Sequence, residues 1–173
     1  MAKARVFVDT NVILESFRTG CWAAICEHFA IETVEKCIEE ALTGDPTNPE
    51  NVNVSVDELI NGLSARHLVT KKELADFALK HPECQLLDDG ELHLLAWLYA
   101  NNLLSTVKVL MSTADKAAIV ATGRLKGLDA LTSLEHLAQE SGASRGQLAE
   151  LKNHYRARWL EEIKVKVRFG IIP

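Results

Sequence analysis

The stretch Arg5-Val6-Phe7-Val8-Asp9-Thr10-Asn11 decides the fold class of this chain. Its first four residues form a short, β-rich apolar run, which is typical of a strand buried in a parallel sheet. Asp9, Thr10 and Asn11 end the run with side chains that favour turns and helix caps. We therefore expect a first strand over 4–8 that passes directly into a helix.

Outward from this stretch, strand-like runs alternate with helical patterns. Strands are expected at 4–8, 29–31, 52–56, 85–87, 107–111 and 130–131. Helices are expected at 12–17, 21–29, after a cap at Thr33, after Ser55-x-x-Glu58, at 71–79 after Thr70-x-x-Glu73, at 89–101, at 114–126, after Thr132-x-x-Glu135, and over 15 to 20 residues after Ser144-x-x-Gln147. The segment 43–51 reads as a surface loop, and 163–169 as a helix or an edge strand. This alternation predicts a three-layer α/β/α sandwich around a mostly parallel sheet of about five strands.

Composition points to one ordinary globular domain. The chain has 173 residues, of which 47% are hydrophobic and 25% charged, with a net charge of -5; these values exclude a disordered tail protein. The four cysteines form no C-x-x-C pair, so we expect reduced thiols in the core. Because the sequence has no membrane-length apolar run and its start has no signal-peptide pattern, we expect a cytoplasmic protein without a membrane partner.

Three acids follow predicted strands or open a helix near strand ends. Asp9 follows the first strand, Asp115 follows the strand at 107–111, and Glu91 lies in the first turn of the helix that begins at Asp88-Asp89-Gly90. Each acid alone is explained at least as well as a turn or cap residue, and for Asp9 that explanation is the more common one. Their joint placement where ligands bind in open parallel sheets favours a site, and such a cluster is costly unless a cation neutralises it.

Three segments resemble PIN-domain nucleases of the branch with a Gly-Glu helix start. They are Val6-Phe7-Val8-Asp9-Thr10-Asn11-Val12-Ile13-Leu14, Leu87-Asp88-Asp89-Gly90-Glu91-Leu92-His93-Leu94-Leu95-Ala96 and Leu110-Met111-Ser112-Thr113-Ala114-Asp115-Lys116-Ala117-Ala118. Residues 127–137 look like the family's final strand and helix, so the likeness spans about residues 5–140. It implies a nuclease domain over 1–140 and a basic helical extension over 141–173 packed on the same domain.

The resemblance also implies a set of site residues. The catalytic carboxylates would be Asp9, Glu40, Glu91 and Asp115, with Asp9, Glu91 and Asp115 holding Mg²⁺ or Mn²⁺, and Thr10, Asn11, Ser112 and Thr113 orienting substrate or ligands. The pattern over 37–42 favours Glu40 as the early acid, with Glu35 and Glu39 as rivals. Because Lys116-Ala117-Ala118 stands where many members carry another acid, the number of bound ions, one or two, remains open.

By resemblance, the expected function is metal-dependent endonucleolytic cleavage of single-stranded or structured RNA, giving 5′-phosphate and 3′-hydroxyl ends. The alternative is a catalytically weak or inactive PIN-like module that binds RNA or protein. A flavodoxin-like phosphotransfer domain ranks last because no persuasive partner lysine follows a later strand. The resemblance allows an antitoxin or other regulatory protein and a second copy of the chain as partners, and leaves a toxin or a processing enzyme equally open.

A basic stretch lies near the C-terminus. Its cations are Lys152, Arg156, Arg158, Lys164, Lys166 and Arg168, interleaved with His154, Tyr155, Trp159 and Phe169. One interpretation is that it contacts phosphates and stacks on bases of RNA. The other is a solvated amphipathic helix whose aromatic side chains pack on the domain or on a partner subunit.

Overall fold

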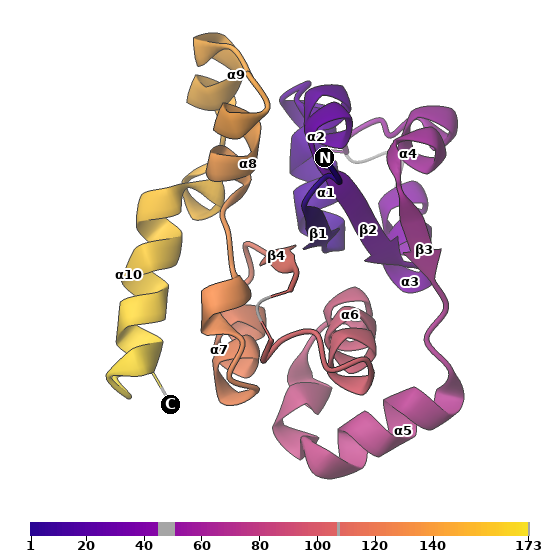
Figure 1. Cartoon of the computed structure of the whole chain (residues 1–173), viewed down its shortest axis with the longest axis vertical. Helices are drawn as coiled ribbons and strands as arrows, with labels where there is room; N and C mark the ends of the chain where they lie inside the picture. The colour runs from indigo at the N-terminus through magenta and orange to yellow at the C-terminus, as the bar shows by residue number, and fades with distance from the viewer. Residues whose placement is uncertain (45–50, 107, 173) are drawn as a thin grey trace.

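The computed structural model describes residues 1–44, 51–106 and 108–172, and its centre is a parallel sheet (Figure 1). The strands are β1 (Arg5–Val8), β2 (Ala30–Val34), β3 (Ala65–His67) and β4 (Leu110–Ser112), in the order β3-β2-β1-β4. Every neighbouring pair is parallel. The α/β class and the parallel sheet flanked by helices are therefore confirmed. The described residues contain four strands instead of five, because Leu131 contributes only an isolated bridge to Met111.

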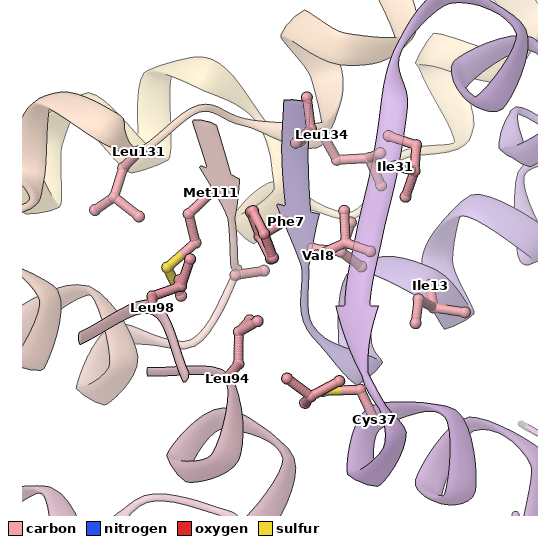
Figure 2. Packing of buried hydrophobic residues seen from close by; sticks show 14 of the residues in the cluster. Phe7, Val8, Ile13, Ile31, Cys37, Leu94, Leu98, Met111, Leu131 and Leu134 are labelled. Atoms are coloured by element: carbon pink, nitrogen blue, oxygen red, sulfur yellow. The ribbon is translucent and has the colours of Figure 1, made fainter. Parts of the chain in front are cut away.

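Strand β1 lies in the middle of the core. Val6, Phe7 and Val8 are at most 1% exposed, although successive side chains of a strand point to opposite faces. Both faces of the sheet are therefore covered. On one face, the ring of Phe7 stacks on Trp97 of helix α6 (Asp89–Ala100), with the ring centres 5.4 Å apart. Figure 2 shows the packing of apolar side chains around β1.

Helices, α6 among them, surround this sheet. The others are α1 (Thr10–Arg18), α2 (Trp22–His28), α3 (Glu35–Leu42), α4 (Val56–Gly62), α5 (Lys71–Lys80), α7 (Lys116–Arg124), α8 (Leu134–Glu140), α9 (Arg145–Glu150) and α10 (Ala157–Arg168). The predicted caps Ser55, Thr70 and Ser144 are confirmed, since each side chain accepts the backbone N–H three residues on. Thr70 and Ser144 complete reciprocal capping boxes.

Several predictions for the first half of the chain are wrong. Thr33 does not cap a helix; it lies in β2, where its buried hydroxyl donates to the carbonyl of Val8 at 2.6 Å. The expected strand over 52–56 is absent, because 51–55 has no regular structure and Val56 begins α4. Strand β3 is missing from the prediction. Of the predicted loop 43–51, residues 45–50 lie outside the described part of the chain.

The second half also departs from the prediction. The run 85–87 belongs mostly to a 3-10 helix, η1 (Pro82–Leu86), and 130–131 forms no strand beyond the bridge of Leu131. Strand β4 is shorter and lies later than 107–111, whose residue 107 is outside the described part. Ser133 caps α8 in place of Thr132. The long final helix is divided into α9 and α10, and α10 includes nearly all of 163–169.

The C-terminal segment packs on the beginning of the chain. The Gln147 side chain donates to the carbonyl of Gly20 at 2.8 Å, and the backbone N–H of Lys152 donates to Glu15 at 2.9 Å. Helix α10 packs along α7 and α8 (Figure 1). These contacts hold 141–172 against the rest of the chain, while a domain boundary near residue 140 stays a prediction. Among the described residues, no helix has the length and apolar content needed to cross a membrane.

Candidate functional site

Asp9 and Asp115 come together because β1 and β4 are neighbours in the sheet. Val8 pairs with Ser112, so the residues that follow the two strands lie side by side. The Thr113 hydroxyl donates a hydrogen bond to Asp9 Oδ2, and the same hydroxyl oxygen accepts the backbone N–H of Asp115 at 3.2 Å. A single threonine therefore links the two aspartates.

Both aspartates also cap helices. Asp9 Oδ1 accepts the N–H of Val12 at 2.9 Å at the start of α1, and Asp115 Oδ1 accepts the N–H of Ala118 at 2.8 Å at the start of α7. Asp9 is only 1% exposed. This burial, with a smaller contribution from the nearby charge of Asp115, raises the pKa of Asp9 to about 6 despite the hydrogen bonds from Thr113 and Val12.

Glu91 lies in the first turn of α6, near enough to the same two aspartates for their charges to act on it. Its side chain is buried, and this burial, together with the charges of Asp115, Asp9 and Asp88, raises the pKa of Glu91 to about 8. The buried charge and the repulsion both favour the neutral acid. The structure thus brings Asp9, Glu91 and Asp115 together at the carboxyl end of the sheet.

Glu40 is the one of the three predicted early glutamates that reaches this region. Its Oε2 accepts the hydroxyl of Thr10 at 2.7 Å and its Oε1 accepts the N–H of Gly90 at 3.0 Å. Glu35 and Glu39 are exposed on α3, and Glu39 pairs with Lys36. Glu40 therefore connects α3 to the starts of α1 and α6, next to the buried acids Asp9 and Glu91.

The predicted orienting residues have different environments. Thr10 and Thr113 each donate their hydroxyl to a site carboxylate, Glu40 and Asp9 respectively. Ser112 is fully buried at the end of β4, and its hydroxyl has no hydrogen-bond partner among the described residues. Asn11 is exposed, and its backbone carbonyl accepts the hydroxyl of Tyr155.

The carboxylates fit the chemistry of a hard divalent cation, but the described side chains do not form a complete set of metal ligands. Carboxylate oxygens are the ligands that Mg²⁺ and Mn²⁺ prefer, and a cation would offset both the burial and the repulsion that raise the pKa values of Asp9 and Glu91. Within the described ranges, however, no three His, Cys, Asp or Glu side chains already stand as a metal-holding group. Both oxygens of Asp9 and of Glu40 accept protein hydrogen bonds. The acids are therefore gathered but not arranged as ligands.

Two residues next to the site were missed by the sequence reasoning. The Tyr155 hydroxyl donates to the carbonyl of Asn11 at 3.2 Å, and both burial and the nearby Asp9 raise the pKa of Tyr155. The Cys37 thiol donates to the carbonyl of Gly90 at 3.4 Å. The spacing of Cys37 on the buried face of α3 could have indicated its position. No local pattern indicates a contact between residues 144 positions apart.

The basic C-terminal stretch is largely occupied by internal ion pairs. Its pairs are Arg156 with Glu135, Arg158 with Glu162, Lys164 with Glu161 and Arg168 with Asp129. His154 packs against Tyr155 and Trp159. These contacts favour the interpretation of a solvated amphipathic helix with Tyr155 and Trp159 packed on the domain, although Phe169 is exposed.

Comparisons of the chain with models of protein families, with curated proteins and with solved structures return no match.

Proposed function

We propose that this chain is a metal-dependent endoribonuclease of the PIN-domain type. The observation that carries the proposal is the Thr113 link between Asp9 and Asp115 at the ends of two neighbouring parallel strands, with Glu91 near both acids. In open α/β sheets this edge is where ligands bind. The order of the three acid-bearing segments in the sequence and its resemblance to PIN-domain nucleases add independent support.

The carboxylates would have different roles in metal binding and positioning. Asp9, Glu91 and Asp115 would hold Mg²⁺ or Mn²⁺, and Thr113 would keep the two aspartates at a fixed separation. A bound ion of this kind supplies charge stabilisation at the scissile phosphate and lowers the pKa of the attacking water. Glu40, through Thr10 and Gly90, would hold the first turn of α6 so that Glu91 points toward the aspartates.

The test compares cleavage of a mixed RNA substrate by the native chain and by two variants in Mg²⁺ and in Mn²⁺. Asp9→Asn keeps an oxygen that caps α1 but loses the charge, so the fold is expected to survive. We expect its cleavage rate to fall on the order of 100-fold or more, since charge stabilisation by the ion is worth several kcal/mol. Asp76→Asn, at an exposed position on α5, is the matched control and should cleave normally.

A second candidate is an inactive binding module that retains the fold. The observation that favours it is that Asp9 and Glu40 use both carboxylate oxygens for protein hydrogen bonds. Titration calorimetry with Mn²⁺ separates the two candidates. A saturable isotherm that disappears in Asp115→Ala supports the nuclease, whereas an absence of both ion binding and RNA cleavage by the native chain supports the binding module.

A further inference from the structure

A groove begins at Asp115 and continues along α7, away from the other acids. Its opposite wall is the 3-10 helix η1 together with Leu87, and its volume is about 480 Å³. The residues that matter for its chemistry are Lys116, Val120 and Arg124 from α7, and Leu86 and Leu87 from the opposite wall. The groove is thus continuous with the candidate site and has the size of a small-ligand pocket.

Two cations border this groove. Lys116 and Arg124 are exposed and stand eight residues apart on α7, so they share a helix face over about 12 Å. In the part of the chain that the structure describes, neither forms an ion pair. The other carboxylate of the lining, Glu83, has His81 Nδ1 3.6 Å from its Oε1. Lys116 and Arg124 are therefore available to an anionic ligand.

The opposite wall is apolar and open. Leu86 is 93% exposed, and with Leu87 it forms an apolar side of the groove opposite α7, while Val120 adds an apolar side chain on α7 itself. An exposed apolar patch rimmed by charges is typical of a binding surface. A ligand with phosphates along one edge and a flat, weakly polar face along the other matches this lining. An unstacked nucleotide of single-stranded RNA has this character.

We propose that this groove binds the nucleotides that flank the scissile phosphate of a single-stranded RNA. Phosphates contact Lys116 and Arg124, and a base packs on Leu86. This inference rests on the proposed function, because Asp115 is shared by the groove and the acid cluster. It also identifies cations that attract a polyanion to an acidic site, a task for which the internally paired C-terminal stretch is poorly suited.

The first experiment measures binding without cleavage. The native chain and the variants Lys116→Gln and Arg124→Gln are titrated into a short fluorescent single-stranded RNA in EDTA, and anisotropy gives the affinity over a range of salt concentrations. Each variant should bind on the order of three to ten times more weakly at low salt, with the log-affinity against log-salt slope reduced by about 0.7 per lost phosphate contact. Lys72→Gln, an exposed position on α5, is the charge-matched control and should change neither value.

The second experiment tests the base contact. Leu86→Ser removes an exposed side chain, so folding is not at risk. We expect weaker binding of single-stranded RNA and unchanged binding of an abasic strand of the same length and charge. If the apolar wall instead accepted a peptide segment of a protein, Leu86→Ser would bind RNA normally, and that result would overturn the base contact.

The two proposals fail separately. The groove proposal would be overturned by unchanged affinity and salt slope in both Lys116→Gln and Arg124→Gln, or by a native chain that binds no RNA at low salt. Metal-dependent cleavage is tested separately, by its own assay. Loss of binding in these variants, together with a native chain that never cleaves RNA, would reject the nuclease and leave the groove as a binding site for single-stranded RNA without a scissile phosphate.

Discussion

At the scale of single residues, the contact between Gly90 and Glu40 explains why the Gly-Glu pair begins α6. A Cβ atom built on Gly90 would lie 2.4 Å from Glu40 Oε2 and 2.8 Å from Thr10 Oγ1, so a side chain there would displace the hydrogen-bonded carboxylate. The glycine allows α3 to approach α6, and the hydrogen bond from its N–H to Glu40 fixes the first turn of α6, which carries Glu91. Packing space, not backbone conformation, is what requires glycine here.

We therefore predict that Gly90→Ala destabilises the chain by about 1 to 3 kcal/mol, because overpacking forces Glu40 and Thr10 to move. Gly146→Ala is the control, since Gly146 is exposed in α9 with only Ser144 Oγ, at 3.8 Å, near its added Cβ. At that position the higher helix propensity of alanine should stabilise the folded chain by about 0.5 kcal/mol. Urea unfolding measures both. An equal loss in the two variants would contradict the packing argument.

Glu91 gives a prediction about pH in the absence of divalent ions. Because its pKa rises from the ordinary 4.5 to about 8 in the folded chain, its stabilising contribution is fully present below pH 4.5 and is lost as the pH rises through about 8. Glu91→Gln cannot ionise. The difference in melting temperature between Glu91→Gln and the native chain should therefore grow in favour of the variant as the pH rises from about 5 to about 9 in EDTA. The corresponding change in the free energy of unfolding is a few kcal/mol.

The control for this pH dependence is Glu27→Gln, at an exposed position on α2. Its melting temperature relative to the native chain should stay constant over the same pH range. A constant difference for Glu91→Gln as well would mean that Glu91 does not carry a raised pKa.

At the scale of elements, short-range signals predicted helix starts better than strands. Ser55, Thr70 and Ser144 were correctly assigned as caps because a cap depends on residues only three positions apart. Strand β3 was missed because Arg66 and His67 have a polar pattern that only pairing with β2 stabilises. There, His67 hydrogen-bonds to Glu32 at 2.7 Å and stacks on Trp97.

A buried carboxylate, Glu15, is one of the groups that link α1 to the C-terminal segment. Glu15 accepts two hydrogen bonds from Arg18 and one from the N–H of Lys152. These partners hold the pKa of Glu15 below its ordinary value, although burial by itself would raise it. Removing the carboxylate would leave the backbone donor of Lys152 and the guanidinium of Arg18 without this acceptor.

We accordingly expect Glu15→Ala to cost about 2 to 4 kcal/mol and to increase amide hydrogen exchange across 145–156. Ser144→Ala, which removes only the cap of α9, should cost about 1 kcal/mol. Its faster exchange should stay confined to α9. Unchanged exchange near Lys152 in Glu15→Ala would show that other contacts hold the segment.

At the scale of the whole molecule, the fold determines where the charged groups and the thiols lie. The net charge of -5 includes acids concentrated at the carboxyl end of the sheet, while several C-terminal cations are neutralised by local partners. The net value therefore says little about an anionic ligand. All four cysteines are free, as expected, and three of them are buried.

The free thiols give a prediction for the intact chain. Burial raises the pKa of both Cys26 and Cys37 to about 12, so the reactive thiolate is scarce at neutral pH. Ellman's reagent should react slowly with the folded chain, with half-buried Cys26 modified first, and with four thiols after unfolding. An unchanged melting temperature with and without reductant is also expected. Fewer than four thiols after unfolding without reductant would contradict the prediction.

By itself, the sequence determined the α/β class, the central strand β1 and the candidate acids Asp9, Glu91 and Asp115, because apolar runs and strand-end carboxylates are local features. Only the tertiary structure decided that Glu40, not Glu35 or Glu39, reaches the site, that Thr113 links the aspartates, and that Tyr155 lies beside them. These outcomes depend on strand register and helix packing, which join residues 30 to 144 positions apart and leave no local pattern.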